Sequence, residues 1–234
     1  MLDALLALLV PPLCAACRGP LRDAGEIVCA TCRRALPWLG EPRCPRCALP
    51  CEAGHLCPAA GQAFSAAFAP VAYHGVARDL VAALKFSHAR PLADVMAAHV
   101  AAGMPQGMRG ATLVAVPAHP ARVRTRGYDQ AALLATALGR RLAAPVARPL
   151  CRRGPAVRQL GASRAERLAQ GRVAVVTPGP VPTRVLRVDD VHTTGGTLDA
   201  CARALLAGGA DEVVAVTWAR ALRPNHIVHV PVPR

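Results

Sequence analysis

The stretch "VLRVDDVHTTGGTL", Val185–Leu198, decides how this sequence folds. A run of apolar residues ends on two adjacent aspartates, Asp189 and Asp190, and a loop of threonines and glycines follows directly. Acids are scarce in this chain, which has 28 Lys+Arg and only 14 Asp+Glu. Two neighbouring carboxylates at the end of a predicted strand therefore mark that end as a candidate site.

The residues around this stretch predict an α/β domain from about Phe64 onward. Five short β-rich runs alternate with longer helical stretches. The predicted strands are "FAPVAY", "ATLVAVPAH", "RVAVV", "TRVLRVDD" and "EVVAVTWAR", and the helices are "VARDLVAALKF", "PLADVMAAHVAAG", "YDQAALLATALGRRLA" and "GTLDACARALLAGGA". Strand, helix and strand at this spacing predict a mostly parallel sheet with helices on its faces. Ligands of such sheets bind at the carboxyl ends of the strands, where we expect the two aspartates.

The loop after the aspartates has the composition of a phosphate site. Gly195 and Gly196 let backbone N–H groups approach a ligand closely, and Thr193, Thr194 and Thr197 add hydroxyl donors. The helix that we expect to begin near Gly196 adds the partial positive charge of its N-terminus. The neighbouring carboxylates would accept hydrogen bonds from hydroxyl groups or help to hold Mg²⁺. A ligand with a phosphate, a diol and a bound metal would be a phosphorylated ribose. The alternative, an acidic N-cap followed by a turn, would explain one Asp and one Thr but not the rest of the stretch.

Eight of the ten cysteines lie within the first 57 residues. The first six form three Cys-x-x-Cys pairs, and eleven residues separate each pair from the next. Two such pairs supply the tetrahedral ligand set of a structural zinc ion, whereas disulfides would need an oxidising compartment that nothing in the sequence supports. The predicted first site consists of Cys14, Cys17, Cys29 and Cys32.

The second zinc site is less regular, because no fourth Cys-x-x-Cys pair follows Cys44 and Cys47. Two of the three residues Cys51, His55 and Cys57 would complete it; otherwise the second ribbon is degenerate. We assign Cys51 and Cys57 as ligands, with His55 as the alternative. Sites of this kind stabilise a small module and carry out no catalysis.

Positive charge is concentrated in one part of the chain. The formal net charge is +14, yet residues 1–62 carry six arginines and five acids. Residues 120–172 carry twelve arginines against only Asp129 and Glu166. This segment either forms a solvated basic face or binds an anion.

The N-terminal segment "MLDALLALLVPPL" does not resemble a signal peptide. It lacks a basic region, contains Asp3 and runs into Pro11 and Pro12. It is also too short to span a bilayer. We expect a short amphipathic or buried helix in a cytoplasmic protein without a membrane span.

The stretch Val185–Leu198 resembles the motif with which type I phosphoribosyltransferases bind 5-phosphoribosyl-1-pyrophosphate (PRPP). The segments "VAALKFSHARPLAD", "VPAHPARVRTRGYDQAALLATAL" and "RQLGASRAERL" are similar in order and spacing to the ComF family. That family joins an N-terminal double zinc ribbon to such a domain, as "CAAC…CATC…CPRC" does here. The resemblance covers nearly the whole chain. It implies a zinc-ribbon module over residues 1–62, and a domain with the type I phosphoribosyltransferase fold over 63–234 that carries the motif at 185–198.

The resemblance also implies roles for individual residues. Asp189 and Asp190 would bind the ribose hydroxyls, and the 5-phosphate would contact Thr193, Thr194, Gly195, Gly196 and Thr197. The predicted loop with Arg122, Arg124 and Arg126 would meet the pyrophosphate, and residues 151–171 would form a mobile hood. Lys85, the single lysine of the chain, joins Asp189, Asp190 and Arg126 in the expected catalytic set, unless it is an exposed helix residue.

The chain departs from the family pattern in three places. Asp129 stands where the family usually has Asn, the segment "RRGPAVRQL" lacks a Thr, and the fourth zinc pair is incomplete. These differences concern the hood and the second metal site rather than the expected PRPP site.

The implied activity is transfer of phosphoribose from PRPP to a nitrogen nucleophile with release of pyrophosphate, assisted by Mg²⁺. No segment identifies the acceptor. The alternative is a non-catalytic accessory protein that senses PRPP, or that handles single-stranded DNA with the competence machinery during natural transformation. Its arginines would suit a phosphate backbone, but aromatic residues make up only 3% of the chain, which disfavours base stacking.

Overall fold

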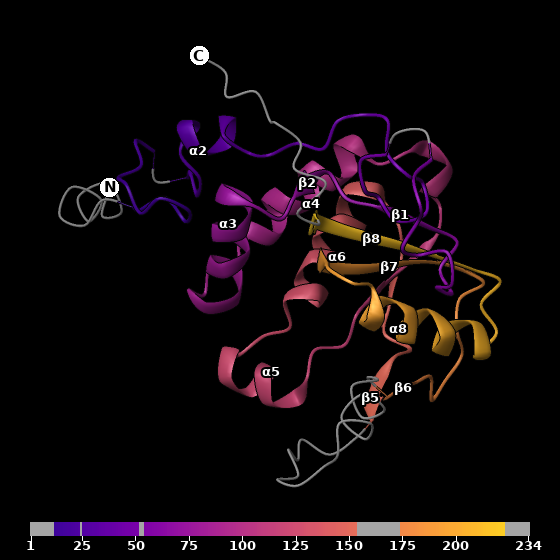
Figure 1. Cartoon of the computed structure of the whole chain (residues 1–234). Helices are drawn as coiled ribbons and strands as arrows, with labels where there is room; N and C mark the ends of the chain where they lie inside the picture. The colour runs from indigo at the N-terminus through magenta and orange to yellow at the C-terminus, as the bar shows by residue number, and fades with distance from the viewer. Residues whose placement is uncertain (1–11, 24, 52–53, 154–173, 223–234) are drawn as a thin grey trace, which may run out of the picture.

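The computed structural model describes residues 12–23, 25–51, 54–153 and 174–222. Within them, six strands form one sheet in which every pairing is parallel (Figure 1). The strand order is β1 (Ala66–Phe68), β8 (Glu212–Arg220), β7 (Arg184–His192), β3 (Thr112–Ala115) and β4 (Val146–Ala147), and β2 (Val71–Ala72) also pairs with β8. The predicted parallel α/β sheet is therefore confirmed.

Helices cover both faces of this sheet. On one face, α3 (Gly75–Phe86), α4 (Leu92–Gly103) and α6 (Gln130–Leu142) bury apolar side chains in one cluster with Leu186 and Val188 of β7. On the other face, α8 (Gly196–Ala207) packs in a cluster with Val185. Because successive strand residues point to opposite faces, one apolar strand serves both layers. Figure 1 shows α8 on the opposite side of β7 and β8 from α4.

Three predicted elements differ from the structure. The run "RVAVV" supplies β6 (Ala174–Val176), which pairs antiparallel with β5 (Cys151–Arg153) outside the parallel sheet. The run "FAPVAY" forms two short strands, β1 and β2, and both pair with β8. Pro70 lies between them, and proline has no N–H with which to continue a ladder. The expected arginine-rich loop is instead helix α5 (Pro120–Arg126). The His119 side chain caps its first turn, and Gly127 ends it with φ 74°.

Strand β7 continues past the two aspartates as far as His192. Its pairing with β8 runs from Arg184 opposite Glu212 to His192 opposite Arg220. On the other side, β3 ends at Ala115, opposite Val188. Asp189 and Asp190 therefore lie inside a strand rather than at its end, at the point where the neighbouring strand β3 has already stopped.

The cysteine-rich segment packs directly on the sheet. The Leu39 N–H donates to the Pro70 carbonyl at 2.9 Å, and the Ala67 N–H donates to the Pro45 carbonyl at 2.8 Å. Apolar residues of both parts, such as Leu49 and Phe64, belong to the same buried cluster. The boundary between residues 62 and 63 stays a prediction. Among the described residues, no helix has the length and apolar character needed to cross a membrane.

Candidate functional site

The first cysteine group has the geometry of a structural zinc site. The sulfur atoms of Cys14, Cys17, Cys29 and Cys32 lie within 4.8 Å of one another. Cys29 is the N-cap of the short helix α2 (Ala30–Arg34), and its Sγ accepts a hydrogen bond from the Cys32 N–H at 3.4 Å. Four thiolates in a tetrahedral cluster are a ligand set that zinc prefers.

The second group corrects one predicted ligand. Cys44, Cys47, His55 and Cys57 bring their ligand atoms within 4.8 Å of one another, and Cys51 is not a member of this group. The backbone explains the difference, because the Cys51 N–H donates to the Pro42 carbonyl at 3.1 Å and Pro50 pairs with Arg43. This anchors Cys51 to the segment before the Cys44–Cys47 turn. The His55 Nε2, by contrast, lies 3.4 Å from the Cys47 Sγ. Three thiolates and one imidazole also fit zinc.

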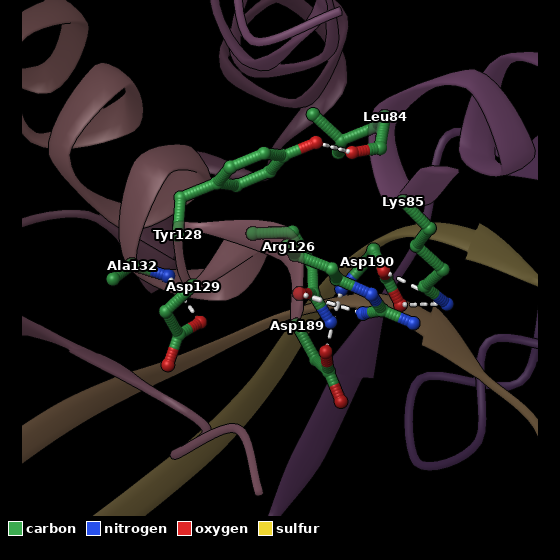
Figure 2. Close-up of polar contacts among 9 residues, drawn as sticks. Leu84, Lys85, Arg126, Tyr128, Asp129, Ala132, Asp189 and Asp190 are labelled. Carbon is green, nitrogen blue, oxygen red and sulfur yellow. Dashed lines mark hydrogen bonds and ion pairs between the residues drawn. The ribbon is translucent and has the colours of Figure 1, made fainter. Parts of the chain in front are cut away.

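The two aspartates of β7 have different partners. Lys85 of α3 places its Nζ 3.0 Å from Oδ1 and 2.9 Å from Oδ2 of Asp190 (Figure 2). The Asp190 side chain is only 5% exposed, and that of Lys85 is 23% exposed. The Asp190 N–H donates to Asp189 Oδ1 at 2.8 Å. Lys85 is thus an ion-pair partner of the acid pair rather than a solvated helix residue.

Asp189 has an unusual protonation equilibrium. Burial raises its pKa to about 7, and the nearby Asp190 carboxylate acts in the same direction. The hydrogen bond from the Asp190 N–H and the charge of Lys85 act against this rise. A carboxyl with a pKa near neutrality changes its charge readily when a ligand arrives, which is typical of functional sites.

Arg187 is a residue that the sequence analysis did not single out. It lies two positions before Asp189, and its side chain is completely buried. Its guanidinium carbon lies 5.9 Å from the Phe64 ring centre. Burial lowers its pKa, while the Cys201 thiol and the Asp189 carboxylate favour its charged form. The sequence offered one signal for this residue, which is a single arginine between the apolar residues of "VLRV".

The loop Thr193–Thr197, called the TTGGT loop below, leads from β7 into α8. Gly195 is the N-cap of α8 with φ 84°, a conformation that favours glycine. The first helical hydrogen bond runs from the Asp199 N–H to the Gly195 carbonyl at 2.7 Å. The amides of Gly196 and Thr197 precede it and have no acceptor within the helix. Thr193 and Thr194 are exposed, so the loop can meet a ligand.

The three arginines of α5 do not form one cluster. Arg126 is half-buried, donates to Gln130 Oε1 at 3.1 Å, and stacks over the Phe86 ring at 4.9 Å. In Figure 2 its side chain extends in the direction of the acid pair. Arg122 and Arg124 are exposed. The charge of Arg122 acts with burial to lower the pKa of Arg152, in the strand β5 (Cys151–Arg153).

Asp129 and Tyr128 fix the segment between α5 and α6. The Asp129 carboxylate caps α6 through the Ala132 N–H at 3.1 Å and accepts from the Ala118 N–H at 3.0 Å. The Tyr128 hydroxyl donates to the Leu84 carbonyl, next to Lys85 (Figure 2). The acid at position 129 therefore serves as a helix cap.

The expected hood lies mostly outside the described residues, which stop at Arg153 and resume at Ala174. On either side of this segment, β5 and β6 (Ala174–Val176) form a two-stranded antiparallel sheet.

Comparisons with known proteins support the zinc assignment. Residues 5–60 match the family model of the double zinc ribbon domain. The N-terminal segment is a double zinc ribbon. No curated protein matches the chain. A solved structure, a hypoxanthine phosphoribosyltransferase from Staphylococcus aureus, is 14% identical with a TM-score of 0.36. The alignment covers 58% of this chain and 66% of that one, just under two thirds of its length. The parallel sheet, rather than this likeness, defines the fold.

Proposed function

We propose that this chain is a ComF-like phosphoribosyltransferase that binds PRPP and Mg²⁺ and transfers phosphoribose to a nitrogen nucleophile. The observation that carries the proposal is one continuous strand, loop and helix. It places two adjacent carboxylates, Asp189 and Asp190, directly before a glycine-rich loop at a helix N-terminus. The type I phosphoribosyltransferase fold is part of the proposal.

Each part of this unit has a chemical task. The amides and hydroxyls of the TTGGT loop would bind the 5-phosphate, because backbone N–H groups at a helix N-terminus attract anions. Asp189 and Asp190 would accept hydrogen bonds from the ribose hydroxyls. When bound, Mg²⁺ would neutralise part of the charge on the pyrophosphate. Lys85, whose ammonium already lies at Asp190, would contribute a second positive charge beside the reacting carbon.

The reaction breaks the bond between C1 and the pyrophosphate oxygen and forms a bond between C1 and the acceptor nitrogen. Charge develops on the leaving pyrophosphate, so positive groups fixed in advance lower the barrier. Arg126 is the arginine of α5 whose guanidinium is held in place, between Gln130 and the Phe86 ring. It is the strongest candidate among the three for this role.

Calorimetric titration with PRPP and Mg²⁺ tests the proposal. The wild type should bind PRPP, and an Asp189→Asn, Asp190→Asn variant should lose binding while both zinc sites stay loaded. Asp94→Asn is the control, because Asp94 pairs with Arg140 on the surface, where both side chains are more than half exposed. Absence of binding by a folded, zinc-loaded wild type would refute PRPP as the ligand.

The second candidate is a non-catalytic role in DNA uptake, as a cytoplasmic protein that handles single-stranded DNA with competence proteins. One observation favours it: Phe86 is 71% exposed and lies against Arg126, next to the exposed arginines of α5. An exposed ring beside guanidinium groups suits stacking with unpaired bases. Salt-dependent binding of a labelled oligothymidine that falls in Phe86→Ala but survives in the Asp189→Asn, Asp190→Asn variant would support this role.

A further inference from the structure

We infer that the second zinc site positions the TTGGT loop through Arg220 and Gln62, which bond to the backbone carbonyls of the loop on the side of the ribbon. The inference rests on the proposed function of that loop as a phosphate site. The contacts of Arg220 and Gln62 join the second ribbon to these carbonyls.

Arg220 forms the first connection. It is the last residue of β8 and is only 4% exposed. Its Nε donates to the Cys47 carbonyl at 2.8 Å, and its Nη1 donates to the carbonyls of His192 at 2.8 Å and Thr193 at 2.5 Å. Because the guanidinium group is a rigid planar fork, it fixes a ligand residue of the zinc site relative to the start of the loop.

Gln62 forms the second connection. Arg46, which lies between Cys44 and Cys47, donates to carbonyls of the turn after Cys57, including that of Gln62 at 2.7 Å. This holds Gln62 so that its Nε2 donates to the Thr194 carbonyl at 2.9 Å. Its side chain fills the space next to the following glycine, where an added Cβ would lie 2.4 Å from the Gln62 Oε1.

The same turn also holds the start of α8. The Asp199 carboxylate accepts from the Ala63 N–H at 2.6 Å. Arg203 pairs with Asp199 at 2.9 Å and donates to the Gly61 carbonyl at 3.1 Å. Two side chains of α8 therefore bond to backbone atoms at the end of the ribbon.

These contacts determine which way the loop amides face. In a planar trans peptide, the carbonyl of one residue and the N–H of the next point in opposite directions. The carbonyls of His192, Thr193 and Thr194 are held on the ribbon side, so the following amides point away from the ribbon. Amides fixed in this direction need no reorganisation when an anion binds.

The first zinc site provides an internal comparison, because it contacts a different part of the domain. Arg18, next to Cys17, donates to Ser87 Oγ at the end of α3 at 2.8 Å. Cys29 and Cys57 are both half-buried ligands, one in each site. Substituting either by serine removes one ligand of one site, and only the second site should affect the loop.

The test compares Cys57→Ser, Cys29→Ser and Gln62→Ala with the full-length wild type. Metal analysis confirms which zinc is lost. Hydrogen exchange measures protection of peptides that cover residues 193–203, in which the amides from Asp199 onward are bonded within α8. Calorimetry measures affinity for ribose 5-phosphate, whose phosphate should occupy the loop, and separately for pyrophosphate, which should not.

We expect Cys57→Ser and Gln62→Ala to accelerate exchange of the loop and to weaken ribose 5-phosphate binding about three- to tenfold, the effect of one lost hydrogen bond. Pyrophosphate binding should change less than about twofold, which a general loss of structure would not allow. Cys29→Ser should leave the loop unchanged.

Unchanged loop exchange in both Cys57→Ser and Gln62→Ala, or equal acceleration by Cys29→Ser, would overturn the inference. If Cys57→Ser does not fold, His55→Ala takes its place, because it removes another ligand of the same site, and Gln62→Ala tests the contact with the loop alone. A wild type that fails to bind ribose 5-phosphate would refute the phosphate role of the loop, while hydrogen exchange would still decide the connection to zinc.

Discussion

Replacing Lys85 by methionine should destabilise the protein by about 3 kcal/mol, because it leaves the Asp190 carboxylate without its ion-pair partner. The ammonium lies 2.9 Å and 3.0 Å from the two carboxylate oxygens, and the Asp190 side chain is 5% exposed. Removing one partner of a buried pair costs roughly 3–5 kcal/mol. We expect the lower end of this range because the Lys85 side chain is 23% exposed.

Urea denaturation of three variants would measure this free energy. The double variant Lys85→Met, Asp190→Asn should recover most of the loss, since position 190 then holds no unpaired carboxylate. Arg140→Ala removes the exposed pair with Asp94, whose side chains are 63% and 53% exposed, and should cost less than about 1 kcal/mol. If Lys85→Met destabilises the protein no more than Arg140→Ala does, the reasoning about a buried ion pair is wrong.

Three further predictions concern other parts of the molecule. His55→Ala should lower the zinc content from two ions to one per chain, whereas Cys51→Ser should leave both, as measured by elemental analysis. The pKa of Asp189 is about 7 against an ordinary value of 3.8, so folding favours the protonated form. The free energy of unfolding should therefore fall as pH rises from about 4 to 7, and Asp189→Asn should flatten that profile; an unchanged profile would contradict the assignment. Gly195→Ala places a Cβ at φ 84° against Gln62 and should lower the denaturation midpoint, with a loss of at least about 1 kcal/mol.

The sequence predicted the main architecture because its patterns are local. Alternating strand and helix segments predicted the parallel sheet, and the spacing of cysteines predicted the first zinc site and three of the four residues grouped at the second. Cys51 was wrongly assigned as a ligand because sequence spacing does not reveal which backbone segment a residue is bonded to. The helix α5 was also missed, although Pro120 at its start and Gly127 after its end are local signals, because a helix of 7 residues is too short to show an apolar period.

The parts that could not be predicted depend on contacts between distant residues. Arg220 lies 173 positions from Cys47 in the sequence, yet it donates to that residue's carbonyl. Gln62 lies 132 positions from Thr194. Neither residue belongs to a motif, and their role appears only when the ribbon packs on the sheet. The ion pair of Lys85 with Asp190 also joins distant residues, which lie 105 positions apart. The sequence marked Lys85 as a candidate because it is the single lysine, but it did not identify the partner.

The position of Lys85 also gives the protein a built-in chemical reporter. Its side chain carries the single ε-amino group of the chain and is partly open to solvent beside the acid pair. A reagent that acylates amines would therefore modify one side-chain amine, in the proposed site, and mass spectrometry of peptides would separate this product from acylation of the α-amino group. Ligands that fill the site should slow this acylation in proportion to occupancy. Candidate acceptors and phosphorylated sugars could thus be ranked on unlabelled protein, without a prior assay of turnover.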